Sequence, residues 1–167
     1  VDNNDQLISE EVVGRLQIKG PMILSSYYQN PELNATVFTE DGWFKTGDLG
    51  YLKQGYLTVT GREKDIIIIN GLNHFSPEIE AIVEEVDGVK PSYTAACGLR
   101  QPGQDTDQLL IFFAPEDSSP DCLKALLKTI QSNIVRKLGI QARYLLLVEP
   151  ETIPKTSIGK IQRLKLK

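Results

Sequence analysis

The residues best placed to do chemistry are four charged side chains in a short turn. They are Arg62, Glu63, Lys64 and Asp65. The turn follows a strand-like run and precedes four consecutive isoleucines, which are β-branched and favour a second strand. Two charges of each sign in so short a turn are typical of a polar-ligand site, of a hinge between two bodies, or of an ordinary solvated turn. Composition alone leaves all three interpretations open.

The other candidates lie further along the chain. A group of basic residues comprises Lys155, Lys160, Arg163, Lys165 and Lys167. Such a group can bind a phosphate, although a solvated tail explains its composition equally well. The single histidine, His74, stands next to Phe75 and before a predicted helix, where packing or hydrogen bonding is a commoner role than general-base catalysis.

Composition excludes several classes of protein. A net charge of −4 argues against a nonspecific nucleic-acid surface, which needs a concentrated basic footprint. Cys97 and Cys122 have no CxxC spacing and only one histidine accompanies them, so no metal site is predicted and a reduced, cytoplasmic setting is expected. No apolar run approaches the ~18 residues of a membrane span, and no signal peptide is visible. Because the chain begins at Val1, we expect a piece of a longer protein.

The elements that must position these residues change character near Gly61. Residues 1–61 predict short strands broken by turns, with a helical turn near 31–35. Beyond Gly61, helices are predicted from Ser76, as N-cap, to Gly88 and from Ser119 to Gly139. Strands are predicted over 93–99, 109–114 and 144–148, the last buried on both faces. The order β, α, β, β, α, β predicts an α+β fold, with helices on one face of a short sheet.

Five segments together resemble a known family. They are 14–21 (GRLQIKGP), 27–32 (YYQNPE), 42–48 (GWFKTGD), 60–65 (TGREKD) and 153–163 (IPKTSIGKIQR). In this order and spacing they resemble core motifs of the adenylate-forming superfamily. That superfamily comprises acyl-CoA synthetases, nonribosomal-peptide adenylation domains, firefly luciferase and fatty-acyl-AMP ligases. The resemblance covers nearly the whole chain.

The resemblance implies a domain organisation and a reaction. Residues 1–61 are similar to the final β-subdomain of the family's large AMP-binding domain, and residues 62–167 to its mobile C-terminal lid. The family joins a carboxylate to ATP, with Mg²⁺, to give an acyl adenylate and pyrophosphate. It then passes the acyl group to a thiol, either of carrier-protein phosphopantetheine or of CoA. The remaining N-terminal large domain would hold most of the ATP and the acyl group, so this chain alone is expected to be inactive.

Site residues follow from the same resemblance. Asp48 matches the carboxylate that accepts from the ribose hydroxyls, and Arg62 matches an arginine that contacts the ribose or phosphate oxygens, which a guanidinium fork suits. A surface ion pair with Glu63 or Asp65 is the alternative explanation of Arg62. Lys160 matches the catalytic lysine, whose mobile ammonium bridges negative charge that builds up during adenylation.

The lid residues are assigned in the same way. Lys64 matches the hinge about which the family's lid rotates after adenylation. The rotation would replace the Lys160 face with the strand after the hinge, so that Asn70, Gly71 and Leu72 line a tunnel for the thiol-bearing arm. Near Lys160, the basic residues Lys155 and Arg163 are expected in a solvated rim.

The subfamily resemblance is narrower. Many members carry a lysine in the strand where this chain has Ile66 to Ile69, so luciferase-like oxidation is not expected. Segments 73–75 (NHF) and 155–163 are most similar to fatty-acyl-AMP ligases and to loading ligases of polyketide or peptide synthetases, which use a carrier protein. Two alternatives stay open: the lid of an acyl-CoA synthetase that uses free CoA, and a noncatalytic module that docks a carrier protein. The acyl substrate is not predicted.

Overall fold

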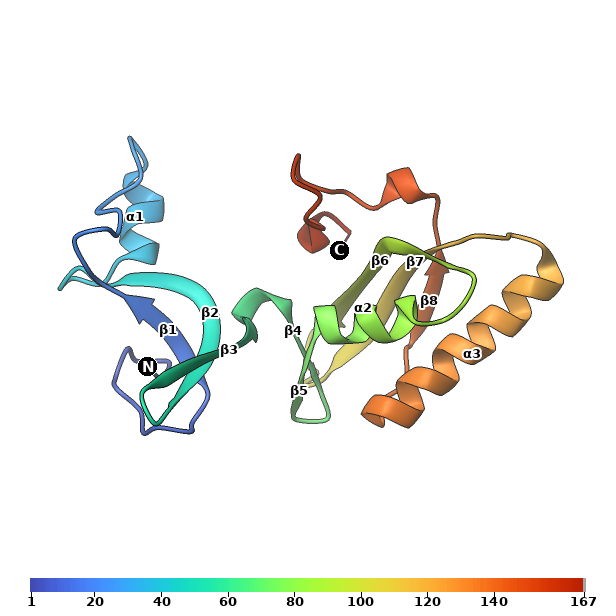
Figure 1. Cartoon of the computed structure of the whole chain (residues 1–167), viewed down its shortest axis with the longest axis horizontal. Coiled ribbons are helices and arrows are strands. Elements are labelled where there is room, and N and C mark those ends of the chain that lie inside the picture. The colour runs from blue at the N-terminus through green and yellow to red at the C-terminus, as the bar shows by residue number, and fades with distance from the viewer. Residues whose placement is uncertain (167) are drawn as a thin grey trace. The chain divides into compact units, whose positions relative to one another are not determined.

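Eight strands and three α-helices form the part of the chain that the structure, a computed structural model, describes: residues 1–166 (Figure 1). They belong to two units, which we call unit 1 (Val1–Lys64) and unit 2 (Asp65–Lys167). The mixture of helices and small sheets confirms the predicted α+β class. None of the described helices combines the length and apolar character needed to cross a membrane.

Unit 1 is a three-stranded antiparallel sheet with one short helix. Its elements are β1 (Gly14–Ile18), α1 (Pro31–Val37), β2 (Phe44–Lys53) and β3 (Tyr56–Arg62), with β2 in the middle of the sheet. The side chain of Asn30 accepts a hydrogen bond from the Leu33 backbone N–H and so caps α1. Among residues 1–64, all of which are described, only Leu49 and Gly50 are buried. At Gly50 a Cβ atom would lie 2.6 Å from the Thr58 carbonyl oxygen, so β3 can lie this close only to a glycine.

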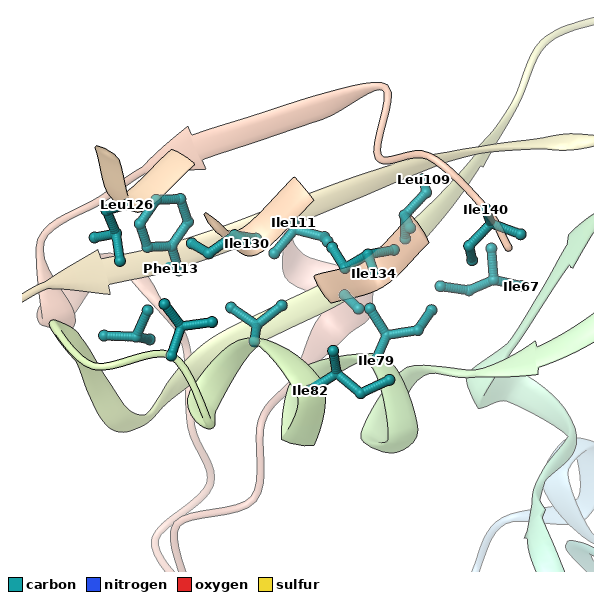
Figure 2. Packing of buried hydrophobic residues seen from close by; sticks show 14 of the residues in the cluster. Ile67, Ile79, Ile82, Leu109, Ile111, Phe113, Leu126, Ile130, Ile134 and Ile140 are labelled. Carbon is teal, nitrogen blue, oxygen red and sulfur yellow. The ribbon is translucent and has the colours of Figure 1, made fainter. Parts of the chain in front are cut away.

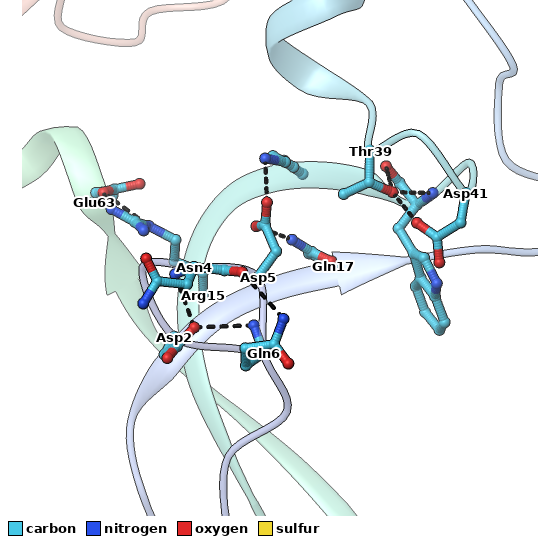
Figure 3. A network of polar contacts seen from close by, with 11 residues as sticks. Asp2, Asn4, Asp5, Gln6, Arg15, Gln17, Thr39, Asp41 and Glu63 are labelled. Carbon is cyan, nitrogen blue, oxygen red and sulfur yellow. Dashed lines mark hydrogen bonds and ion pairs between the residues drawn. The ribbon is translucent and has the colours of Figure 1, made fainter.

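Acidic side chains fasten the N-terminal segment to the sheet of unit 1 (Figure 3). The Asp5 carboxylate accepts hydrogen bonds from Gln17 on β1, at 2.6 Å, and from Lys45 on β2, at 2.7 Å. The hydrogen bond from Lys45 lowers the pKa of Asp5. Asp2 accepts from the backbone N–H groups of Asn4 and Gln6, which closes the turn that contains Asp5. Side-chain contacts of this kind order unit 1, which has little apolar core.

Unit 2 contains two sheets and two longer helices. Its elements are β4 (Ile66–Ile69), β5 (Leu72–Phe75), α2 (Ser76–Glu84), β6 (Val89–Arg100), β7 (Asp107–Pro115), α3 (Pro120–Leu138) and β8 (Tyr144–Leu147). Strands β4 and β5 form a hairpin, and the second sheet has the order β6-β7-β8, with β7 and β8 parallel. Gly139 ends α3 in the left-handed region, as its position after the last apolar residue predicts.

The core of unit 2 lies between the two helices and one face of the second sheet (Figure 2). Alternate residues of β7 point into it, namely Leu109, Ile111 and Phe113. The apolar stripes of α2 and α3 meet them through Ile79, Ile82, Val83, Leu126, Ile130 and Ile134. Each fully buried side chain of this kind contributes about 1.5–3 kcal/mol. The predicted arrangement, with both helices on one face of the sheet, is therefore confirmed.

Three features differ from the sequence-based expectation. Strand β5 was not expected; the Asn70-Gly71 turn, with φ angles of 52° and 79°, has the two left-handed residues of a tight hairpin, so the chain returns along β4. Phe75 rather than Ser76 is the N-cap of α2, and the Ser76 hydroxyl instead donates to the Asp65 carbonyl. The strand predicted over 144–148 is not buried on both faces, because β8 is an edge strand whose Tyr144 and Leu147 are exposed.

Candidate functional site

Asp48 and Arg62 are brought together in unit 1. They are register partners on β2 and β3, and Arg62 Nε donates to Asp48 Oδ1 at 2.8 Å. The side chains remain 45% exposed at Arg62 and 33% exposed at Asp48. An ion pair this open contributes only ~0–1 kcal/mol, because water screens it. The contribution of this ion pair to folding stability is therefore too small to explain its presence.

Neighbouring groups fix the orientation of the pair. Arg62 Nη2 also donates to the Thr46 carbonyl at 3.0 Å, so two of its nitrogens are held. The Thr46 hydroxyl accepts from the Asp48 backbone N–H and donates to the Leu16 carbonyl on β1. Within the described residues no group hydrogen-bonds Asp48 Oδ2. The second carboxylate oxygen is thus a fixed acceptor that a ligand hydroxyl can use.

The alternative partners proposed for Arg62 are wrong. Glu63 accepts from Arg15 of β1 instead, within unit 1 (Figure 3). Asp65 pairs with Arg163, within unit 2. Lys64, the predicted hinge residue, is exposed in the 3₁₀ turn Glu63–Asp65 that joins β3 to β4. The two acidic residues of the charged turn, Glu63 and Asp65, therefore bind different arginines, and Lys64 is exposed to solvent.

Lys160 lies in a closed loop near the C-terminal end of unit 2. The Thr156 hydroxyl accepts from the Lys160 backbone N–H at 3.0 Å, and the Lys160 carbonyl accepts from the Thr156 N–H at 2.8 Å. Gly159 has a φ angle of 81°, which permits the tight turn between them. The Lys160 side chain is exposed, and its ammonium forms no ion pair or hydrogen bond within the described residues. The loop is therefore ordered while its cation remains available.

Arg163 anchors this loop, which corrects the expectation that it belongs to a solvated rim. Its guanidinium lies 3.1 Å from Asp65 Oδ1 and 2.5 Å from Glu80 Oε2, and its Nε donates to Glu80 Oε1 at 2.7 Å. The three side chains are only 10–17% exposed. Glu80 Oε1 also accepts from the Ala96 N–H at the free edge of β6. Arg163 thus ties the C-terminal segment to the 3₁₀ turn Glu63–Asp65 and to α2, and Glu80 extends the contact to β6.

Burial sets the electrostatics of this cluster, which we call the Arg163 cluster (Asp65, Glu80 and Arg163). Burial raises the pKa of Glu80, against the lowering effect of Arg163 and the Ala96 N–H. Burial also opposes the charge of Arg163, but its hydrogen bonds to Glu80 and the charges of both carboxylates raise its pKa. Lys155 is likewise not freely solvated, because its ammonium lies 3.5 Å from the centroid of the Tyr93 ring.

The predicted thiol-tunnel residues lie together at the tip of the β4–β5 hairpin. Asn70, Gly71 and Leu72 are all exposed, Leu72 by 64%. His74, on the same hairpin, is 7% exposed, and its buried Nε2 has no hydrogen-bond partner in the described part of the chain. Residues 1–166 contain no group of three or more His, Cys, Asp or Glu side chains placed to hold a metal ion.

Comparison with known proteins gives a consistent family of relatives. The family model described as "Disco-interacting protein 2-like, AMP domain" matches residues 64–167. The nonribosomal peptide synthetase apvA of Aspergillus terreus is 38% identical over 169 aligned residues, which cover 99% of this chain. The chain spans 18% of the length of that synthetase.

Solved structures extend the comparison across both units. The structure described as McyG A-PCP complexed with phenylalanyl-adenylate is 46% identical, with a TM-score of 0.89 over 99% of this chain and 26% of its own. A fatty acyl-adenylate ligase from a study of the Escherichia coli and Legionella pneumophila enzymes is 32% identical, with a TM-score of 0.85. That match covers 100% of this chain and 29% of the ligase.

Proposed function

This chain belongs to the adenylate-forming superfamily, and we propose that it is the C-terminal part of a ligase that activates a carboxylate with ATP and transfers the acyl group to a thiol. The observation that carries the proposal is the exposed Lys160 ammonium, which has no partner in the described residues and whose backbone closes a hydrogen-bonded turn with Thr156. An ordered loop with such an exposed ammonium is well suited to bind the negatively charged oxygens of a phosphate and a carboxylate.

The division of labour follows the two units. Residues 1–61 serve as the last β-subdomain of the large AMP-binding domain, and residues 62–167 as the lid, with Lys64 as the hinge. The boundary between the units, after Lys64, supports this assignment. Dihedral changes in domain closure concentrate in a few residues at the ends of elements, and the 3₁₀ turn Glu63–Asp65 is such a place.

Each polar group then has a chemical role. Asp48 accepts a hydrogen bond from a ribose hydroxyl through its open Oδ2, while Arg62 holds the carboxylate in place and adds positive charge for phosphate oxygens. Lys160 stabilises the negative charge that develops as the substrate carboxylate attacks the α-phosphate and pyrophosphate leaves. Mg²⁺ accompanies ATP, and its ligands are assigned to the remainder of the large domain.

The acyl acceptor is proposed to be a carrier-protein phosphopantetheine thiol. Two comparisons support this choice: apvA is a nonribosomal peptide synthetase, and the McyG structure combines its A and PCP parts with an acyl adenylate. The thiol attacks the carbonyl carbon of the acyl adenylate, a thioester forms and AMP leaves. Asn70, Gly71 and Leu72, at the exposed hairpin tip, would line the path of the thiol arm.

The test uses the full-length ligase that contains this chain. Substrate-dependent pyrophosphate release is measured across a panel of fatty, aromatic and keto acids, and thioester formation is then compared on free CoA and on holo carrier protein. Release with one class of acid, followed by loading of the carrier protein, is the expected result. Loading of CoA alone would overturn the choice of acceptor, and a folded enzyme that releases pyrophosphate with no acid would overturn the proposed activity.

Asp48→Asn is expected to raise KM for ATP about tenfold with a smaller change in kcat. The amide keeps the shape of the side chain but loses the charge that strengthens hydrogen bonds from the ribose and from Arg62, a difference of ~1.4 kcal/mol. Pyrophosphate release at varied ATP concentration measures both constants. Asp117→Asn, at an exposed loop position in unit 2, is the control. Equal KM values for wild type and Asp48→Asn would exclude contact between Asp48 and the nucleotide.

A further inference from the structure

The outer edge of the β4–β5 hairpin is held by side chains rather than by a third strand. Among the described strands β4 pairs only with β5, so the backbone groups along its other edge have no neighbouring strand to bind them. The Ile68 N–H donates to Asp107 Oδ2 at 2.7 Å, and the Asn70 N–H donates to the Thr106 hydroxyl at 3.0 Å. That hydroxyl also lies 3.5 Å from the Ile68 carbonyl, to which it donates. Thr106, just before β7, and Asp107, its first residue, thus take the place of a neighbouring strand.

The anchor is itself rigid. The Asp107 side chain is 11% exposed, and its other oxygen accepts from Arg100 Nε at 2.8 Å, across the β6–β7 ladder. Beneath it, a Cβ atom on Gly98 would lie 3.1 Å from both the Asp107 carboxylate and Ile67 of β4. The absence of a side chain at Gly98 lets the hairpin and the anchor pack closely. An isolated two-stranded hairpin is marginally stable, so its position depends on such contacts.

We propose that Thr106 and Asp107 are positioning residues for thiol transfer, acting through the hairpin. This inference rests on the proposed function, in which the hairpin tip lines the path of the thiol arm. The Thr106 hydroxyl accepts from the backbone N–H of Asn70, the first residue of the hairpin tip. The Asp107 carboxylate accepts from the Ile68 N–H and so fixes β4, the strand that leads to the tip. In the described part of the chain, neither residue hydrogen-bonds the Lys160 loop, so we expect adenylation to proceed without them.

Two matched substitutions at Thr106 test the proposal in the full-length ligase. Thr106→Val keeps the branched shape and removes the hydroxyl, whereas Thr106→Ser keeps the hydroxyl. Thr106→Val is expected to slow acyl transfer from a preformed adenylate about 10- to 100-fold, because a displaced attacking group loses its alignment. Pyrophosphate release should stay within about twofold of wild type, and Thr106→Ser should retain transfer. Asp105→Asn, at an exposed neighbouring position, is the control.

Hydrogen exchange of the Ile68 and Asn70 amides supplies a readout independent of activity. Both amides should exchange faster in Thr106→Val, Asn70 most of all, while amides of α3 keep their protection. Faster exchange together with selectively slowed transfer supports the proposal. Unchanged transfer, or an equal fall in adenylation and transfer, overturns it. A wild-type enzyme that forms no adenylate overturns the proposed function and this inference with it.

Discussion

Lys160→Ala is expected to lower the rate of acyl-adenylate formation by about 10²- to 10³-fold. The structure places the Lys160 ammonium in solvent with no partner in the described residues, and the turn is closed by hydrogen bonds from the Thr156, Gly159 and Lys160 backbone N–H groups. Alanine therefore removes the charge without leaving a buried group unpaired or opening the turn. The loss should appear in kcat, since the interaction strengthens as negative charge develops in the transition state.

Two half-reactions separate this effect from a general loss of activity. Pyrophosphate release measures adenylation, and acyl transfer from a chemically prepared adenylate measures the second step. Lys160→Ala should reduce the first and leave the second within about twofold of wild type. Lys165→Ala, which removes an exposed lysine from the following 3₁₀ turn, is the matched control. Adenylation that persists in Lys160→Ala would favour the noncatalytic docking module.

The local pattern of apolar residues predicted most helices and strands of the fold. It failed for strands whose burial or existence depends on how they pair in a sheet. The apolar stripes of α2 and α3 repeat every three to four residues and bury one face, so both helices were found. The run at 144–148 is apolar throughout, but a continuous run cannot reveal that its strand will lie at a sheet edge. Strand β5 was missed because its residues alternate weakly; the Asn70-Gly71 turn was its clearest signal.

The candidate site was predictable as a set of residue types but not as a set of partners. The resemblance to family motifs proposed Asp48, Arg62 and Lys160 as site residues, yet nothing in the sequence paired Asp48 with Arg62 across two strands. Arg163 was placed in a solvated rim because it lies among lysines. Its carboxylate partners are distant in sequence, and only Glu80, an acid beside the apolar stripe of a predicted helix, offered a hint. The Thr106 and Asp107 contacts had no sequence signal.

Arg163→Met is expected to lower the free energy of unfolding of unit 2 by about 3 kcal/mol near neutral pH. Methionine keeps most of the apolar stem, so packing changes little. The loss comes from the carboxylates of Asp65 and Glu80, which remain 10–13% exposed and lose their shared cation. Circular dichroism during urea unfolding measures the change. The helical signal reports mainly on unit 2, because its helices α2 and α3 contain 9 and 19 residues, whereas α1 of unit 1 contains only 7.

The pH dependence of this loss identifies its cause. Burial raises the pKa of Glu80 in the folded state, so the folded chain binds more protons than the unfolded chain, and the contribution of Glu80 to stability falls as pH rises through its folded pKa. Without Arg163 the pKa of Glu80 rises further, and the destabilisation should be larger at about pH 7.5 than at about pH 5. Adding Glu80→Gln to Arg163→Met should recover part of the free energy of unfolding, because it removes one unpaired charge. The control is Arg143→Met at an exposed position, whose free energy of unfolding should stay within about 0.5 kcal/mol of wild type. A loss that is independent of pH and not relieved by Glu80→Gln would mean that packing of the arginine stem, rather than its charge, holds the Lys160 loop against the rest of unit 2.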